Sequence, residues 1–162
     1  MLVGVVTIPT GTASAATAVT TTVNGQTVDL TYDGEGTSAS PYQIDTLAKL
    51  QGMQADLSAH YQLVHDIDAS ATQGWNGGAG FDPVGDAGTA FTGNFDGKNH
   101  TISQLFIDRG GETQVGLFGG TNGGAIKRVG LTDINVTGGT FAGGLVGKTF
   151  GPLKQVFSTG VV

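Results

Sequence analysis

Cysteine is absent from this chain of 162 residues, and proline occurs only four times. The lack of cysteine excludes disulfides, thiolate metal sites and cysteine nucleophiles. The scarcity of proline excludes collagen and a proline-rich linker. Charged residues make up only 12% of the chain and hydrophobic residues 38%, whereas a disordered chain would be highly charged and poor in apolar residues. We therefore expect one folded domain, and a chain of this length buries a core without help from disulfides.

Positive charge is also scarce, since 7 Lys and Arg face 13 Asp and Glu, and the formal net charge is −6. A nucleic-acid-binding domain is expected to carry a basic stripe, so this composition predicts no nucleic acid partner. An acidic surface likewise disfavours docking on anionic membranes. No segment of the sequence approaches the length and apolar character of a transmembrane span, so we predict no membrane insertion.

The first fifteen residues have the features of an export signal. Residues Leu2–Pro9 are almost all apolar, and Ala13-Ser14-Ala15 fits the A-x-A cleavage pattern. We interpret residues 1–15 as the remnant of a signal peptide, which places the protein outside the cell or on its surface. No Lys or Arg precedes Lys49, so the basic region of a complete signal is missing. This favours a misplaced start or a fragment, and the alternative reading of the segment is an N-terminal β-strand.

Residues 16–40 are predicted to form N-terminal strands and a linker. Val19–Val23 and Thr27–Tyr32 alternate weakly between apolar and polar residues. They flank Asn24-Gly25, a dipeptide that favours a tight hairpin turn. Residues 33–40 are rich in Gly and Ser and are expected to be a loop.

One short helix is expected after this linker. Asp45 is a suitable N-cap, and Leu47, Leu50 and Met53 recur at helical spacing, so the helix should extend to about Gln54. Terminal units of repeat proteins need a cap, and a short amphipathic helix can cover the open end of a stack of strands.

Glycine is the most unusual component, with 29 residues in the chain, or 18%, against about 7% in average proteins. From Tyr61 onward the glycines separate short apolar segments, which indicates tight turns between short strands. The longest alternating segment is Tyr61–Ile67, and a loop is expected between Ser70 and Gly80. Asp96-Gly97 is interpreted as a turn and not as a nucleophilic site.

The last third of the chain contains an internal repeat. Gly116–Gly119 matches Gly144–Gly147, 28 positions later, and Ile126–Val129 matches Leu153–Val156, 27 positions later. A period in the 20s indicates units that bury their apolar surface only by stacking. Patterns of helical solenoids and of leucine-rich repeats are missing. We therefore predict an all-β fold, a right-handed parallel β-helix (solenoid) with one short N-terminal capping helix, over residues 41–162.

The predicted β-helix has about four coils from Tyr61 onward. Equivalent apolar positions of its repeats should point largely inward. These positions are Leu117, Phe118, Ile126, Val129, Leu145, Val146, Leu153 and Val156.

Three segments near the C-terminus, Phe141–Gly147, Leu153–Val156 and Ser158–Gly160, together resemble the GLUG motif. The upstream segments are similar to those that often precede GLUG repeats, and they are Tyr42–Ile44, Tyr61–Asp68 and Phe91–Ile102. The resemblance covers roughly residues 40–162. GLUG repeats occur in filamentous haemagglutinin-like adhesins, in immunoglobulin A1-cleaving surface metalloproteases and in many archaeal surface proteins. The resemblance thus implies a repeat architecture and a surface protein, but no single activity.

From this resemblance we expect a structural or adhesive segment of an exported cell-surface protein, without enzymatic activity. Its expected partner is a host or neighbouring-cell surface, or an extracellular glycan. Two alternatives stay open: a non-catalytic carbohydrate-binding part of a polysaccharide-active enzyme, and the N-terminal part of a larger secreted protease. The chain stops at Val162 just after a repeat, which favours a fragment and self-association through the last coil, Phe141–Val162.

The sequence offers few candidates for chemistry. On one strand, Asp66 and Asp68 would point to the same side, but no calcium-binding loop pattern is present. His60, His65 and His100 lack the spacing of metal ligands. We therefore predict no catalytic, cofactor-binding or metal-binding residues and no cofactor.

Other motifs also have an ordinary interpretation. Arg109 and Arg128 lie in polar, turn-like contexts and are interpreted as surface residues, not as the catalytic arginine of a lyase. Residues Ala142–Thr149 come close to a phosphate-binding loop, but Gly151-Pro152 would prevent the helix that must follow. Trp75 is expected to cover the edge of a coil rather than to contact a sugar. Two further residues, Asn99 and Asn135, fit the N-glycosylation triplet.

Overall fold

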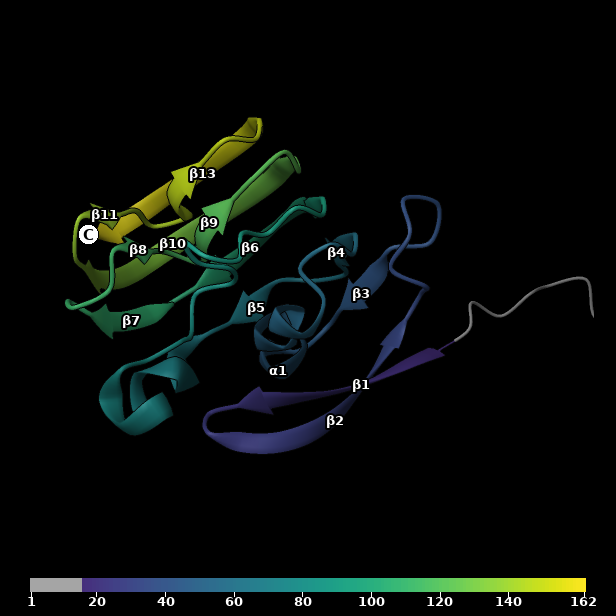
Figure 1. Cartoon of the computed structure of the whole chain (residues 1–162), viewed down its shortest axis with the longest axis horizontal. Coiled ribbons are helices and arrows are strands. Elements are labelled where there is room, and N and C mark those ends of the chain that lie inside the picture. The colour runs from purple at the N-terminus through teal and green to yellow at the C-terminus, as the bar shows by residue number, and fades with distance from the viewer. Residues whose placement is uncertain (1–15) are drawn as a thin grey trace, which may run out of the picture.

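A computed structural model describes residues 16–162 and shows a mainly β fold with parallel sheets and a short helix (Figure 1). That part of the fold prediction is confirmed, and the signal-peptide prediction for residues 1–15 lies outside the described residues. The first strands are β1 (Ala16–Val23), β2 (Gln26–Asp33), β3 (Tyr42–Ile44), β4 (Tyr61–Leu63), β5 (Ile67–Asp68), β6 (Phe95–Ser103) and β7 (Phe106–Arg109). The later strands are β8 (Gln114–Val115), β9 (Phe118–Thr121), β10 (Ile126–Gly138), β11 (Phe141–Ala142), β12 (Val146–Thr149) and β13 (Leu153–Val161). The helical segments are α1 (Leu47–Gln51) and two 3₁₀ helices, Gly52–Ala55 and Ser70–Gly78.

The N-terminal hairpin forms as predicted. Strands β1 and β2 are antiparallel, and Val23 pairs with Gln26 across a two-residue loop. Asn24 and Gly25 have φ values of 50° and 71°. A type I′ turn requires positive φ at both positions, and its twist matches that of the flanking strands, which explains why Asn-Gly selects this hairpin.

The short helix forms, but its cap differs from the prediction. Thr46, not Asp45, is the N-cap: it has extended backbone angles, and its hydroxyl accepts a hydrogen bond of 3.2 Å from the Lys49 amide. Asp45 instead pairs with the Lys49 ammonium at 2.9 Å. A side chain caps best when it reaches the amide three residues on, and Thr46 is at that spacing from Lys49. The α-helix ends at Gln51 and continues as a 3₁₀ helix.

Five strands of the main parallel sheet lie side by side in chain order, β3-β4-β6-β10-β13 (Figure 1). One register row crosses all five strands at Tyr42, Tyr61, Phe95, Ile126 and Leu153. The steps between these residues are 19, 34, 31 and 27 positions. The predicted period in the 20s therefore holds only for the last step, because the earlier connections differ in length.

The internal repeat found in the sequence corresponds to strand pairing. Strand β12 pairs with β9, placing Val146 beside Phe118, and β13 pairs with β10, placing Leu153 beside Ile126 and Val156 beside Val129. These are the offsets of 28 and 27 positions that the sequence predicts. Another short parallel pair, β8 with β11, extends the same stacking.

Three local predictions are wrong in detail. The alternating segment Tyr61–Ile67 is split into β4 and β5 by a bend. The expected loop after Ser70 is largely 3₁₀ helix. Asp96-Gly97 is not a turn but lies within β6, and the chain bends one residue later, where Lys98 and Asn99 have φ values of 53° and 69°.

The core contains a continuous row of aromatic rings. Neighbouring ring centroids from Tyr32 through Tyr42, Tyr61 and Phe91 to Phe118 are 5.0 to 6.2 Å apart. This row runs from the hairpin into the stacked strands, so the hairpin shares the core of the domain.

The eight apolar positions predicted to point inward are not all covered to the same extent. Five of them are buried, namely Leu117, Phe118, Ile126, Val129 and Leu145. Val146 and Val156 are half-buried, and Leu153 is 41% exposed. The expectation for Leu153 is therefore wrong, because β13 has a neighbouring strand only on its β10 side.

Candidate functional site

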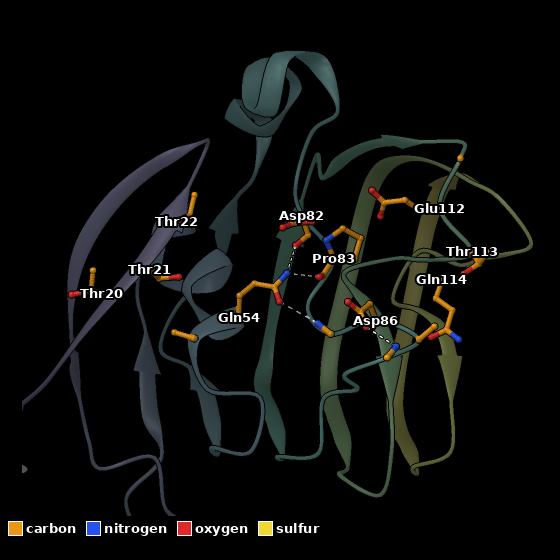
Figure 2. Close-up of a pocket in the computed structure, with 15 residues that line it drawn as sticks. Thr20, Thr21, Thr22, Gln54, Asp82, Pro83, Asp86, Glu112, Thr113 and Gln114 are labelled. Carbon is orange, nitrogen blue, oxygen red and sulfur yellow. Dashed lines mark hydrogen bonds between the residues drawn. The ribbon is translucent and has the colours of Figure 1, made fainter.

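A polar pocket of about 960 Å³ lies between the hairpin and the connections that follow it in the stack (Figure 2). Strand β1 forms one wall, the 3₁₀ helix after α1 lies at the base, and the loops around residues 82–88 and 111–114 form the opposite wall. Hydroxyl, amide and carboxylate groups predominate in its lining. They come from Thr20, Thr21, Thr22, Thr113, Gln54, Gln114, Asp82, Asp86 and Glu112.

Two glutamines fix the base of this pocket. The Gln51 side chain is buried and makes two hydrogen bonds with the backbone of Asp82, donating to its carbonyl at 2.8 Å and accepting from its amide at 2.9 Å. Gln54 donates to the carbonyl of Pro83 and accepts from the Gly85 amide at 3.4 Å. Buried amide groups must find such partners, so the helix and the loop hold each other in place.

The charges in the pocket are partly neutralised. The Arg109 guanidinium lies 3.3 Å from the Asp82 carboxylate and 2.7 Å from that of Glu112. Burial raises the pKa of Asp82, Arg109 opposes this shift, and the negative charges of Glu112 and Asp86 add to it. Asp86 accepts hydrogen bonds of 2.7 Å from the backbone amides of Gly88 and Thr89, so its carboxylate shapes the loop. The arrangement is suited to hydrogen bonding of a polar ligand.

Asp66 and Asp68 do not form a carboxylate pair. Asp66 precedes β5, so the predicted same-side geometry of a strand does not apply to it. Its carboxylate accepts a hydrogen bond of 2.8 Å from the Thr101 amide and lies 3.2 Å from His100 Nδ1. The Asp68 carboxylate accepts from the Ser70 amide at 2.9 Å. These backbone hydrogen bonds are the main reason that the pKa of each aspartate is lowered, because they favour the charged form.

The histidines have separate local contacts. Nδ1 of His60 lies 2.8 Å from the Asn94 side-chain nitrogen, and Nδ1 of His65 lies 2.8 Å from the Asp66 carbonyl. Across residues 16–162, no group of three or more His, Asp or Glu residues has an arrangement that could hold a metal ion.

The two arginines are more than solvated surface residues. The Arg109 side chain is only 15% exposed and pairs with Asp82 and Glu112, two residues that line the pocket. Arg128 forms a two-pronged contact with the Asp96 carboxylate, from Nε at 3.0 Å and from Nη2. Burial raises the pKa of Asp96, but the hydrogen bonds from Arg128 and from the Lys98 amide outweigh it, and the net shift is downward. Sequence reasoning missed this pair, because its members lie 32 positions apart.

The remaining motifs lie on strands or in the 3₁₀ helix Ser70–Gly78. Residues Val146–Thr149 of the loop that resembles a phosphate-binding motif form strand β12. Trp75 is half-buried and packs against the core. Asn99 and Asn135 are both exposed. In the part of the chain that is described, no helix combines the length and the apolar character needed to cross a membrane.

Comparison with known proteins gives two relatives. The chain is 43% identical over 172 aligned positions to Halomucin from Haloquadratum walsbyi, a match that covers 94% of the chain but 2% of Halomucin. It is 38% identical over 130 positions to a Gly-rich membrane protein from Evansella cellulosilytica, covering 76% of the chain and 15% of that protein. No family model matches the chain, and no solved structure matches it. The chain is thus similar to a small part of each of two longer proteins.

Proposed function

We propose that this chain is a structural or adhesive segment of an exported cell-surface protein, built as a right-handed parallel β-helix of GLUG-type repeats and without enzymatic activity. The observation that carries the proposal is the register row through Tyr42, Tyr61, Phe95, Ile126 and Leu153. In repeat proteins, units that stack in register and contact only their neighbours form stiff, extended domains.

The alternation of side chains in this sheet supports a coil with an inside and an outside. The row just described is aromatic or apolar, and the next row along the strands is polar, at Gln43, Gln62, Asp96, Lys127 and Lys154. Successive residues of a strand face opposite sides of a sheet, so one row lines a core and the other faces solvent. The similarity to Halomucin and to a Gly-rich membrane protein favours a location at the cell envelope.

The stacking can be tested by cross-linking, because the chain has no cysteine of its own. Adjacent strands lie about 4.8 Å apart, within the Cα separation that a disulfide spans. We expect the pairs Gln43→Cys with Gln62→Cys and Lys127→Cys with Lys154→Cys to oxidise readily. The control pair Gln43→Cys with Lys127→Cys, three strands apart, should stay reduced. The stacked coils would be contradicted if the control pair formed a disulfide, or if neither test pair did.

The location requires a separate test on cells. Antibodies raised against residues 16–162 should label intact cells that produce the native full-length protein, and external protease should remove the label. Labelling only after permeabilisation would contradict a surface role without affecting the proposed fold.

A second candidate function is binding of a neutral glycan in the polar pocket, as a non-catalytic module. The specific observation is its mixture of hydroxyl, amide and carboxylate groups around Gln54, Asp82 and Gln114. Sugars are bound by such convergent polar groups. On a glycan array, Gln114→Ala should abolish binding of one sugar class while Trp75→Ala, outside the pocket lining, leaves it intact. If only Trp75→Ala abolished sugar binding, the sugar would instead bind at the 3₁₀ helix Ser70–Gly78.

A further inference from the structure

The outward polar row of the main sheet ends in a cluster of positive charge. The chain has seven Lys and Arg residues, all within the described part, and four of them gather on neighbouring strands at this end of the row. Lys98 lies on β6, Lys127 and Arg128 lie on β10, and Lys154 lies on β13. We call these four residues the basic row. A concentration of this kind is unexpected in a chain whose net charge is −6.

Register places the charges in line. Asp96 is beside Lys127, and Lys127 is beside Lys154, so their side chains leave the same face of the sheet. Figure 1 shows β6, β10 and β13 side by side in this order. Parallel strands are spaced about 4.8 Å apart, so Lys127 and Lys154 present their cations on neighbouring strands, and Lys98 lies beside the Asp96 end of the row.

One carboxylate, that of Asp96, lies beside the basic row, and Arg128 is paired with it. Both hydrogen bonds from the Arg128 guanidinium go to Asp96, whose side chain is only 14% exposed. The ammonium groups of Lys127 and Lys98 lie 3.6 and 3.8 Å from the same carboxylate, beyond hydrogen-bond distance. Lys127 and Lys98 are 42% and 45% exposed, and Lys154 is exposed as well. Three ammonium groups therefore keep hydrogen-bond donors directed toward solvent.

The same row continues with neutral amides. Beyond Asp96 it passes through Gln62 on β4 and Gln43 on β3, both half-buried. Amide groups both donate and accept hydrogen bonds, so they can bind the hydroxyl groups of a ligand. Ammonium groups only donate, and they bind carboxylate or sulfate groups more strongly because these are charged. A linear ligand lying across the strands would meet amides at one end and cations at the other.

We propose that the basic row binds an acidic polysaccharide, with its carboxylate or sulfate groups on Lys98, Lys127 and Lys154 and its hydroxyls on Gln62 and Gln43. Arg128 acts as a positioning residue, because it neutralises Asp96 and leaves the lysines available. This surface lies on the outward face of the main sheet and does not depend on the polar pocket or on the proposed surface location.

The test uses residues 16–162 at low ionic strength, with dextran sulfate, polyglucuronate and neutral dextran as probes in calorimetry. We expect binding of one or both acidic polymers, weakening with added salt, and no binding of neutral dextran. Lys127→Gln with Lys154→Gln should weaken binding by about tenfold, the effect of removing two surface charges that each contribute a few tenths to one kcal/mol.

A matched control removes the same charge elsewhere. Lys49 pairs with Asp45, and Lys148 lies over the rings of Phe141 and Phe150, so Lys49→Gln with Lys148→Gln has the same net charge as the test variant. We expect it to bind acidic polymer like the wild type. Equal loss in both variants would overturn the proposal in favour of a general charge effect, as would absence of binding to both acidic polymers. Equally strong binding of duplex DNA would overturn the polysaccharide assignment.

Discussion

At the residue scale, close approach of backbone explains several of the glycines. A glycine lies two positions before each of three stacked strands, at Gly93, Gly124 and Gly151. A Cβ atom on Gly124 would collide with the carbonyl oxygen of Gly93, and one on Gly151 with that of Gly124. None of the three has positive φ. These corners therefore require glycine because it has no side chain, and not because of its backbone freedom.

We predict that Gly124→Ala lowers the free energy of unfolding by about 1–3 kcal/mol, the usual cost of forcing extra volume into a packed site. The clash is with backbone, which cannot rotate away as a side chain can. Urea unfolding followed by circular dichroism measures the change. Gly74→Ala is the matched control, because a Cβ there meets nothing within 4 Å. Equal effects of the two substitutions would show that the corner contact is not the cause.

A second residue-scale prediction concerns pH. The folded state lowers the pKa of Asp96 despite partial burial, because Arg128 and the Lys98 amide donate hydrogen bonds to its carboxylate. The stability from this group is therefore present above the ordinary pKa of about 3.9 and is lost as pH falls through the lowered value. Asp96→Asn should be less stable than the wild type at pH 7, and the difference should shrink below about pH 4. Urea unfolding at a series of pH values checks this, and a difference independent of pH would contradict it.

At the scale of elements, the hairpin is attached to the helix by one side chain. The Tyr32 hydroxyl donates a hydrogen bond of 2.7 Å to the Lys49 carbonyl, and its ring packs 5.2 Å from that of Tyr42. Burial raises the pKa of Tyr32 above its usual value, because it penalises the charged phenolate. The side of Gly52 that faces Tyr32 has no room for a Cβ atom, which shows how closely helix and hairpin approach.

We predict that Tyr32→Phe destabilises the chain by about 1 kcal/mol, the net contribution of one such hydrogen bond, because the Lys49 carbonyl loses its partner. Amide hydrogen exchange should quicken in β1 and β2 more than in β10, since the hairpin is attached at this point. Tyr42→Phe serves as control, because its hydroxyl makes no hydrogen bond with residues 16–162. Uniform acceleration across both regions would instead indicate that hairpin and stack unfold as one unit.

At the scale of the whole molecule, the two ends of the main sheet are covered differently. The hairpin packs near β3, where Tyr32 contacts Tyr42. At the β13 end, large apolar side chains are exposed, with Phe157 at 54% and Phe150 at 71%. Exposed strand edges and apolar patches promote association between chains.

We therefore predict that residues 16–162 self-associate through β13, which light scattering at increasing concentration would detect. Leu153→Thr with Phe157→Thr should restore a monomer by removing apolar surface, and Val64→Thr, an exposed apolar site elsewhere, should not. Hydrogen exchange should also be faster at Val156 than at Leu117. A wild-type monomer at high concentration, with equal protection at both positions, would contradict the prediction.

Much of the local structure could be predicted because its causes are close in sequence. Asn24-Gly25 selects a hairpin through its own backbone angles, and that strand pair formed as expected. The repeat offsets of 27 and 28 positions predicted which residues of β10 and β13, and of β9 and β12, lie side by side.

The sequence did not predict which residues meet in the candidate sites. Asp96 meets Arg128 only because the step between β6 and β10 is 31 positions, a length with no counterpart elsewhere in the sheet. The bends at Lys98, Arg128 and Gln155 all have positive φ on residues other than glycine, a conformation that sequence patterns rarely indicate. The basic row depends on these bends and on that register.

The sequence by itself determined the mainly β class, the hairpin and the equivalence of the last repeats, because turn chemistry and spacing act over a few residues or recur along the chain. Only the tertiary structure decided that Thr46 caps the helix, that Arg109 neutralises the pocket and that the lysines of three strands form one row. The contact of Arg109 with Asp82 and the alignment of the lysines join residues about 30 positions apart, through connections of unequal length whose register is set by core packing. The cap is a local contact, but Asp45 and Thr46 are both suitable capping residues, and only the position at which the helix starts decides between them.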